Sequence, residues 1–243
     1  MPQVHCSDGI HFDHLRVERD GVVVIPNLSL QLTERRIGLI GHNGSGKSSL
    51  VRVVNGLLPS TTGHVEVFGE NPSQGPRHMA STVGFIFQNP DHQVIFPTVI
   101  EELAFGLRNQ GLSRRDAEQH GLDLLARYGR ADWAYRPVHA LSDGQKQLLC
   151  IFAVLLLEPK LLILDEPFSA LDLPTRYQLL DLLHSLPQQI LMISHELDTL
   201  NDFDRVIWLE QGQLKGDGTP QEILPEYVAH ARAQRAEWAV VTA

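Results

Sequence analysis

Alternation of apolar and polar residues predicts strands in the first third of the chain. Leu28, Leu30 and Leu32 alternate with polar neighbours, which is the period of a strand buried on one face. The stretch 65–67, with glutamate between two valines, repeats this pattern. We therefore expect the early part of the chain to be β structure.

A strand, a glycine-rich turn and a helix are predicted next. The apolar segment 36–40 runs into a turn that contains Gly41, Gly44 and Gly46. From Lys47 the pattern is helical as far as Leu57, where glycine and proline residues end it.

From residue 83 onward, predicted strands alternate with predicted helices. Apolar runs predict strands at 83–87, 161–164, 190–194 and 205–209, and helical patterns occur at 142–157, 174–185 and 196–201. Between Pro97 and Tyr128 we expect two helices, with breaks at Gly106, Gly111 and Ser113. This alternation predicts a doubly wound α/β core.

Two helix starts carry capping signals. Ser142 and Gln145 have the spacing of a capping box, and the apolar run behind them predicts a buried helix. Thr219 and Glu222 have the same spacing, with Pro220 at the first helical position, so a final helix is expected there.

Composition narrows the classes of function. The chain has 243 residues, with 29 acidic and 20 basic side chains and a formal charge of −9. This balance argues against a nucleic-acid binder built on basic stripes. The two cysteines, Cys6 and Cys150, give no reason to expect a disulfide, so we expect a reducing, intracellular setting.

No segment has the character of a membrane span or a leader. The longest apolar run, 148–157, is shorter than the roughly 20 residues needed to cross a bilayer. The first residues lack a cationic start and a hydrophobic segment, so no secretory signal is expected.

The segment 41–48, with the sequence GHNGSGKS, matches the phosphate-loop pattern and stands between a predicted strand and a predicted helix. Its glycines allow backbone N–H groups to converge on an anion at the helix N-terminus. Lys47 is expected to hold the β- and γ-phosphates of a nucleotide, and the Ser48 hydroxyl to bind magnesium. We expect the nucleotide contacts to lie within this loop and the first helical turn, at Gly41, Asn43, Gly44, Ser45, Gly46, Lys47, Ser48 and Ser49.

Two carboxylates follow the apolar strand predicted at 161–164. Asp165 is placed to fix the ligand shell of a magnesium ion, because ligands bind at the carboxyl ends of strands in α/β sheets. Glu166 is placed to act as a general base toward a water that attacks the γ-phosphate. An acidic pair that merely ends a strand is the alternative, and the phosphate loop upstream favours the functional interpretation.

These motifs, with four others in a fixed order, resemble those of the ATP-binding subunit of ATP-binding cassette (ABC) transporters. The resemblance covers about residues 10–225. Asp165 and Glu166 close a Walker B segment. The other motif residues are Gln88 of the Q-loop, the signature 141–145 (LSDGQ), the D-loop 169–172 (SALD) and His195 of the switch.

The resemblance implies an α/β fold with a P-loop NTPase core of mixed or parallel sheet, an N-terminal antiparallel β subdomain and an inserted helical subdomain. It implies a single ABC ATPase domain over 1–243, with core and β subdomain at about 1–89 and 160–243 and the helical subdomain at about 90–159.

The resemblance also implies a head-to-tail pair of chains that hydrolyses ATP with Mg²⁺. Each ATP is then held between one chain's phosphate loop and the other chain's signature helix. On this basis Ser142, Gly144 and Gln145 contact the nucleotide, Asp172 links the two sites, His195 senses the γ-phosphate and Gln88 contacts the magnesium or the attacking water. The expected catalytic residues are Glu166, His195 and Gln88, and the expected metal ligands are Ser48, Gln88 and Asp165.

The segments 88–93 and 96–106 are similar to those of energy-coupling factor (ECF) ATPases, the vitamin and metal-ion uptake branch. In that branch Gln93 and its neighbours form a short helix beside the groove for coupling helices of a transmembrane partner. Asp91, Glu101 and Glu102 are candidates to attract cationic residues there; a solvated acidic face is the alternative. The resemblance thus implies a transmembrane coupling subunit and a substrate-binding membrane subunit as partners, and a place on the cytoplasmic face of the membrane.

Within the ECF branch, the short C-terminal part and the Asp143 substitution in the signature most resemble the ATP-binding subunit of the biotin uptake system. Cobalt or nickel uptake is the second candidate. A soluble ABC ATPase of DNA repair or translation is the competing class, but its usual second cassette, zinc insertion or basic arm is absent from the sequence.

Several positions depart from the family pattern or carry no expected role. Arg19 stands where relatives place an aromatic residue to stack on adenine. Asp143 either faces the helical insert or weakens the closed state. Trp133 and Tyr135 are expected to pack at the end of the helical insert, and Trp208 in a late strand. The 12 histidines show no pair with zinc-ligand spacing and are interpreted as scattered surface residues.

Overall fold

The structure is a computed structural model that describes residues 8–169 and 171–241. Cys6 lies outside the described residues. The chain divides into two compact units, with boundaries after Pro76 and after Ile190. The first unit combines the residues up to Pro76 with those from Leu191 onward, and the second unit runs from Arg77 to Ile190. These boundaries differ from the predicted limits of the helical subdomain, about 90–159. The division into core and helical subdomain therefore stays a prediction.

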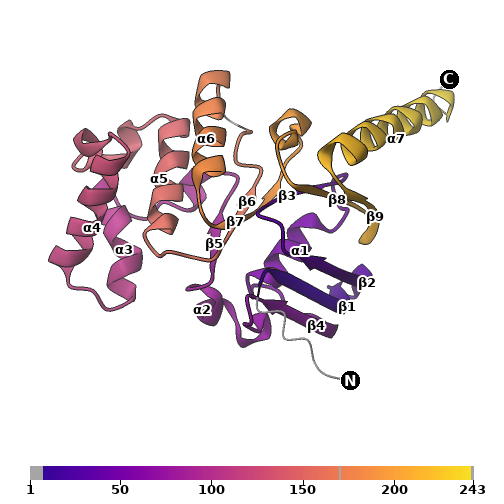
Figure 1. Cartoon of the computed structure of the whole chain (residues 1–243), viewed down its shortest axis with the longest axis horizontal. Helices are drawn as coiled ribbons and strands as arrows, with labels where there is room; N and C mark the ends of the chain where they lie inside the picture. The colour runs from indigo at the N-terminus through magenta and orange to yellow at the C-terminus, as the bar shows by residue number, and fades with distance from the viewer. Residues whose placement is uncertain (1–7, 170, 242–243) are drawn as a thin grey trace. The chain divides into compact units, whose positions relative to one another are not determined.

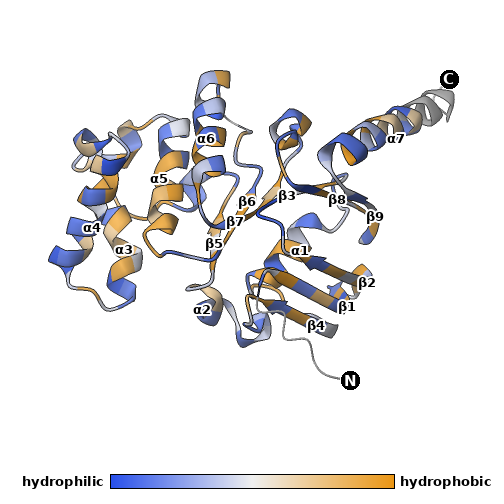
Figure 2. Cartoon of the chain, viewed as in Figure 1, coloured by the Kyte–Doolittle hydropathy of each residue, from blue (hydrophilic) through white to orange (hydrophobic). Residues whose placement is uncertain are grey.

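A three-stranded antiparallel sheet opens the first unit. It consists of β1 (Ile10–Arg19), β2 (Val22–Leu32) and β4 (Thr62–Val67), in the order β2-β1-β4. The strands show the expected alternation of hydrophobic and hydrophilic residues in Figure 2. Leu28, Leu30 and Leu32 are all buried, which confirms the predicted half-buried strand.

The rest of the first unit carries the phosphate loop. β3 (Arg36–Ile40) pairs in parallel with β8 (Arg205–Glu210), and β8 pairs antiparallel with β9 (Gln213–Gly218), so this sheet is mixed. α1 (Lys47–Val54) follows the loop. α7 (Pro220–Val241) packs on β8 and β9 (Figure 1). β9 was not among the predicted strands, because its glycines and charged residues give no apolar alternation.

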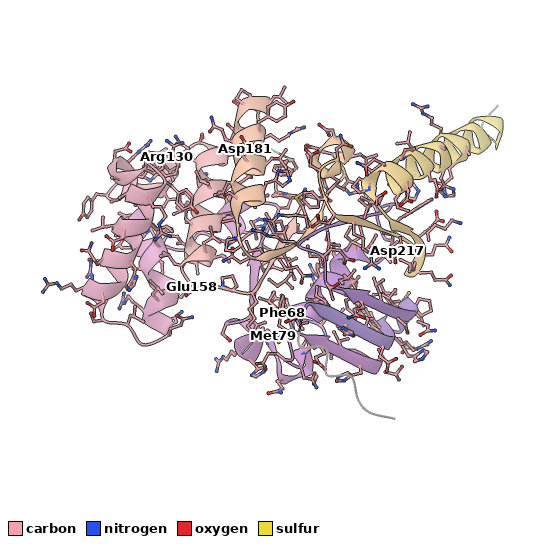
Figure 3. All side chains as sticks on the ribbon, in the orientation of Figure 1. Phe68, Met79, Arg130, Glu158, Asp181 and Asp217 are labelled. Carbon is pink, nitrogen blue, oxygen red and sulfur yellow. The ribbon has the colours of Figure 1, made fainter. Side chains whose placement is uncertain are left out.

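Arg205 ties three strands of the first unit together. Its guanidinium forms a bidentate pair with Asp217 at 2.6 and 2.7 Å, and Asp217 is labelled on β9 in Figure 3. It also donates to Glu34 at 3.0 Å and to the Gln31 carbonyl of β2 at 2.9 Å. These hydrogen bonds and charges raise the pKa of Arg205 against the effect of burial. The side chain is thus a fixed cation that links β8 to β9 and to β2.

The second unit contains two parallel strands and a group of helices. β5 (Val83–Ile86) and β6 (Leu161–Asp165) pair in parallel, and both are almost uniformly hydrophobic in Figure 2. The short α2 (Pro76–Met79) begins at the boundary between the units, and α6 (Leu173–Ser185) follows β6. β7 (Gln189–Ile193) crosses the other boundary. Two helices are joined by a short turn and pack with a third: α3 (Val99–Asn109), α4 (Arg114–Arg127) and α5 (Asp143–Leu155).

Gly106 does not break a helix, contrary to the prediction. It lies inside α3, and a Cβ atom there would come within 2.8 Å of the Leu157 side chain. A close approach of side chain to backbone therefore explains this glycine. The break falls at Gly111, which has a φ of +99° in the turn before α4.

The predicted capping box is complete at α5, and at α7 its Glu222 half is present. At α5 the Ser142 hydroxyl accepts from Gln145 N, and the Gln145 side chain accepts from Ser142 N. At α7 the Glu222 carboxylate accepts from the N–H and the hydroxyl of Thr219. The helix predicted at 196–201 is instead a 3-10 turn over Leu197–Leu200.

Of the three aromatic residues assigned to packing, two are buried. Trp133 is 5% exposed, and the Arg130 guanidinium, labelled in Figure 3, lies 5.2 Å from its ring centre. Trp208 is 4% exposed. Tyr135 is 77% exposed, so its predicted packing is wrong. In the described part of the chain, no helix has both the length and the apolar character to cross a membrane.

Candidate nucleotide site

The phosphate loop holds its lysine on its own backbone. Lys47 is 6% exposed, and its ammonium group donates to the carbonyls of Gly41 at 2.7 Å and His42 at 2.9 Å. The loop is closed further by a hydrogen bond from Ser45 N to the His42 carbonyl. A buried cation is thus positioned at the start of α1, where the helix N-terminus adds positive potential.

Gly41 is required by the space around the loop. Its φ is +148°, and a Cβ atom would lie 2.2 Å from the Leu209 carbonyl oxygen and 2.6 Å from the Ser45 hydroxyl. Gly46 caps α1 with a φ of +101°. The backbone of Gly212 donates to the Ser45 carbonyl, which fastens the loop to the turn after β8.

The polar groups of the loop suit a polyphosphate. The Ser45 hydroxyl oxygen is buried and lacks a hydrogen-bond partner among the described residues. Asn43, Gly44 and Ser48 are exposed, and Ser49 is half-buried in the first turn of α1. Exposed N–H and hydroxyl donors around a buried lysine form an anion cradle of the kind that phosphate loops present.

A second constellation lies at the carboxyl ends of β5 and β6, within the second unit. The Gln88 side-chain amide donates to the Glu166 carboxylate at 3.0 Å. Asp165 and Glu166 are both half-buried. Glu166 has a φ of +50°, a left-handed conformation that costs an L-residue free energy. Amide and carboxylate oxygens are ligands that suit Mg²⁺.

The signature helix begins with exposed groups. Ser142 is exposed at the N-cap of α5, and Gly144 lies so close to Thr175 that a Cβ atom would meet its methyl group at 2.6 Å. Asp143 lies 3.8 Å from Lys146. Lys146 in turn donates to Asp91 at 2.7 Å. Asp143 therefore has a cationic neighbour on its own helix, which offsets part of its charge.

Two further motif residues lie on structured turns. Asp172 is the N-cap of α6 and accepts from Thr175 N at 3.0 Å; these hydrogen bonds lower its pKa. His195 is exposed directly after Ser194. Ser194 is 3% exposed, and its hydroxyl accepts from Glu196 N and bonds with Thr199. Ser194 was missed by the sequence analysis because a lone serine after a strand carries no signal.

The acidic residues proposed to attract a partner have intramolecular contacts. Glu102 is 7% exposed and accepts from the N–H groups of Ile95 and Phe96, each at 2.9 Å. Glu101 accepts from the Thr98 hydroxyl, and Asp91 pairs with Lys146. Glu102 is thus part of the interior, because it satisfies the backbone that leads into α3, and it cannot form an acidic surface.

Arg19 stands at the position where relatives place an adenine-stacking residue. This residue is exposed on β1, where its guanidinium lies 3.5 Å from Asp20. The structure therefore brings predicted residues together in two groups. One comprises Lys47 and its loop in the first unit, and the other comprises Gln88 and Glu166 in the second.

Comparison with known proteins identifies the family. A family model described as "ABC transporter" matches residues 25–169. The chain belongs to the ABC transporter family, and its similar relatives are the ATP-binding proteins of that family, which are ATPases.

Individual relatives point to one branch. The chain is 46% identical to the biotin transport ATP-binding protein BioM of Rhodobacter capsulatus, over 92% of this chain and 96% of that protein. It is 35% identical to the energy-coupling factor transporter ATP-binding protein EcfA of Methanosphaera stadtmanae, over 85% of this chain and 77% of that protein.

A solved structure has the same fold. The chain is similar to cbiO1 from Clostridium perfringens, described as part of the ABC transporter complex cbiONQ, with a TM-score of 0.80 and 27% identity. The similarity covers 90% of this chain and 91% of that one. The predicted α/β class, with a mixed sheet and a separate antiparallel sheet, is confirmed.

Proposed function

We propose that this chain is the ATP-hydrolysing subunit of an ECF-type importer for biotin. The Gln88–Glu166 hydrogen bond of 3.0 Å carries the catalytic part of this proposal, because it joins two motif residues that are 78 positions apart. The identity of 46% to a biotin transport ATP-binding protein supports the substrate.

The nucleotide contacts follow from the phosphate loop. Lys47 exchanges its two backbone carbonyl partners for the β- and γ-phosphates of ATP, and Ser45 donates its unpartnered hydroxyl. The remaining contacts come from the N–H groups of the loop and the first turn of α1, at Gly41, Asn43, Gly44, Gly46, Ser48 and Ser49. Because the lysine is already buried, little further desolvation accompanies binding.

Mg²⁺ is the proposed metal, held by Ser48, Gln88 and Asp165. Their hydroxyl, amide and carboxylate oxygens are the hard ligands that this ion prefers. When bound, the ion neutralises charge on the phosphates. Glu166 orients the attacking water and accepts its proton, and the Gln88 amide fixes the carboxylate in the required direction.

A pair of identical chains is proposed as the active form. Ser142, Gly144 and Gln145 of one chain bind the γ-phosphate of the ATP on the other, because exposed donors at the N-terminus of α5 favour an anion. Asp172 links the two sites, and His195, held on its turn by Ser194, responds to the γ-phosphate. Closure of the pair on ATP is the step that produces motion.

We propose that a transmembrane coupling subunit docks on the second unit, at the cytoplasmic face of the membrane. A groove there is lined by Asp91, Val94, Phe96, Pro97, Val138, His139 and Lys146. Ile95, which lies beside this groove in sequence, is 69% exposed. Most of the groove is apolar, and Lys146 and Asp91 add one cation and one anion. Such a lining suits an amphipathic helix of the partner.

Transport in vesicles tests this proposal. The chain is copurified from membranes with its companion subunits, reconstituted into liposomes and supplied with ATP on the side of the ATPase. We expect ATP-dependent movement of labelled biotin, and the same complex carrying Glu166→Gln should show none. A complex that moves Co²⁺ or Ni²⁺ and not biotin would contradict the substrate assignment, and a chain that copurifies with nucleic acid and no membrane protein would contradict the transporter assignment.

A further inference from the structure

Three side chains with metal-binding atoms meet at the end of β8, all within the first unit. They are His42 of the phosphate loop, Glu210 at the last position of β8 and His230 in α7. One ligand atom from each lies within 4.8 Å of the other two. We propose that these residues form a binding site for Zn²⁺.

The donor set fits this ion. Two imidazoles and one carboxylate form the protein part of many zinc sites, with the fourth position left for water or another ligand. All three side chains are half-buried, with 29% of the His230 side chain and 19% of the Glu210 side chain exposed. A fourth ligand from solvent can therefore reach the ion.

His42 provides the strongest single indication. Its Nε2 atom is shielded from solvent and has no hydrogen-bond partner among the described residues. A buried ring nitrogen without a partner costs free energy, and such atoms in native proteins usually bind a ligand, a water or an ion. Ser45 N and Lys47 bond to the carbonyl of His42, so the backbone that carries this ring is fixed.

Glu210 and His230 are already in hydrogen-bond contact with each other. The His230 Nε2 atom lies 2.7 Å from Glu210 Oε1, and the Gln234 side-chain amide lies 3.0 Å from the same nitrogen and 3.4 Å from the same oxygen. Lys215 lies 3.5 Å from the other oxygen, Oε2, so Oε1 is the oxygen offered to the metal once the exposed Gln234 side chain turns away from it. Because a histidine binds Zn²⁺ through the lone pair of a neutral ring, the ion takes the place of the Glu210 and Gln234 contacts at His230 Nε2.

The adjustment needed for coordination is small. Zinc bonds of about 2.0–2.2 Å place neighbouring ligand atoms about 3.3 Å apart. The two ligand atoms that lie farthest apart, within 4.8 Å of each other, must therefore approach. Glu210 Oε1 and His230 Nε2, now 2.7 Å apart, must move slightly away from each other. Aromatic rings stand beside the site: the Tyr227 ring centre is 5.8 Å from that of His42, and the Trp208 ring centre is 5.1 Å from that of His230. Such an apolar wall limits access of water to the ion.

The expectation from the sequence that the histidines lack zinc-ligand spacing is correct only for neighbours along the chain. His42 and His230 lie far apart in sequence and meet because α7 packs on β8. A bound ion would fasten α7 to the loop that contains Lys47. The site thus lies beside the nucleotide loop but uses none of the proposed nucleotide ligands.

Calorimetric titration with Zn²⁺ alone tests the proposal. The protein is the untagged full chain in a Cys6→Ser background, freed of metal and without nucleotide. We expect one Zn²⁺ per chain, and we expect His230→Gln and Glu210→Gln each to weaken binding about 100-fold. His120→Gln is the matched control, because this exposed histidine lies outside the cluster; its affinity should equal that of the parent.

Co²⁺ provides a spectroscopic check on the ligands. Co²⁺ in a four-coordinate site absorbs strongly in the visible, so the parent should develop bands that both variants lack. No uptake of Zn²⁺ by the parent, or variants that bind like the parent, would overturn the proposal. Circular dichroism checks that each variant is folded like the parent. If one variant is not, the Zn²⁺ affinity of the other variant tests the proposal. Because no nucleotide is present, either outcome is independent of the proposed ATPase function.

Discussion

The side-chain amide of Gln88 donates a hydrogen bond to Glu166 Oε2 across 3.0 Å. Gln88 follows β5 and Glu166 follows β6, and these strands pair in parallel, so their carboxyl ends lie at the same edge. Glu166 has a left-handed φ of +50°. The backbone conformation and the amide together fix the direction of the carboxylate.

Replacing Gln88 with leucine should slow hydrolysis without weakening the binding of ATP measured in the absence of Mg²⁺. The variant keeps the size of the side chain but removes the donor to Glu166, so the carboxylate is less well oriented. We expect kcat to fall on the order of 10-fold. Steady-state ATPase assays with Mg²⁺ and equilibrium ATP binding without Mg²⁺ measure the two effects. Gln110→Leu, at an exposed glutamine on the end of α3, is the control, and an equal loss in both variants would refute the orienting role.

Alanine at Gly41 should disrupt the phosphate loop. The new Cβ atom would lie 2.2 Å from the Leu209 carbonyl oxygen, so the loop or β8 must move. We expect the free energy of unfolding to fall by about 2–3 kcal/mol and ATP binding to be lost, as measured by urea denaturation and nucleotide titration. Gly111→Ala is the matched control, because Gly111 also has a positive φ but open space around it. If both substitutions lower the free energy of unfolding and ATP binding equally, the positive φ alone, and not the contact with Leu209, explains the need for glycine at position 41.

Asp143 should have little influence on the ATP bound by the same chain. Its carboxylate lies 3.8 Å from Lys146, which is held on the other side by Asp91 at 2.7 Å. The hydrogen bond that Lys146 donates to Asp91, with the charges of both carboxylates, raises the pKa of Lys146, so this lysine is fully charged at neutral pH. We expect Asp143→Asn to change ATP affinity less than about twofold in the dissociated chain. A large gain in affinity would show that the carboxylate faces the phosphates.

Cys150 should be unreactive in the folded protein. Burial, with the nearby charges of Glu102 and Asp91, raises the pKa of its thiol to about 12. At pH 8 the nucleophilic thiolate is therefore scarcely populated, and the residue is only 1% exposed. In a Cys6→Ser background we expect no labelling by a maleimide until the chain unfolds in urea. Rapid labelling of the native chain at pH 8 would contradict this environment.

The sequence predicted those features that depend on local chemistry. The spacing of Ser142 and Gln145 predicted a reciprocal cap, and both hydrogen bonds are present. The apolar run before Asp165 predicted a buried strand, and Leu161 to Leu164 are all fully buried. Capping and burial follow from neighbouring residues, so a single sequence contains the necessary information.

Features that depend on tertiary contacts were not predictable. From the sequence, Glu102 is expected to be a surface carboxylate. In the structure it is buried and accepts hydrogen bonds from two backbone N–H groups. The sequence predicts a helix break at Gly106, whereas this glycine lies inside α3 and the Leu157 side chain packs against it. The cluster of His42, Glu210 and His230 arises only when α7 packs on β8. In each case the decisive partner lies elsewhere in the chain.

The most direct test of ATP hydrolysis by this chain is the fate of bound nucleotide in Glu166→Gln. This variant keeps the shape of the side chain but removes the proposed base, so turnover should fall by about 100-fold or more. Light scattering after gel filtration with Mg²⁺ and ATP should show a dimer that retains unhydrolysed ATP. Glu226→Gln, at an exposed position of α7, should hydrolyse ATP like the parent and elute as the parent does. If Glu166→Gln instead turns over ATP at the parental rate, or remains a monomer without nucleotide, the account of this chain as a paired ATPase is contradicted.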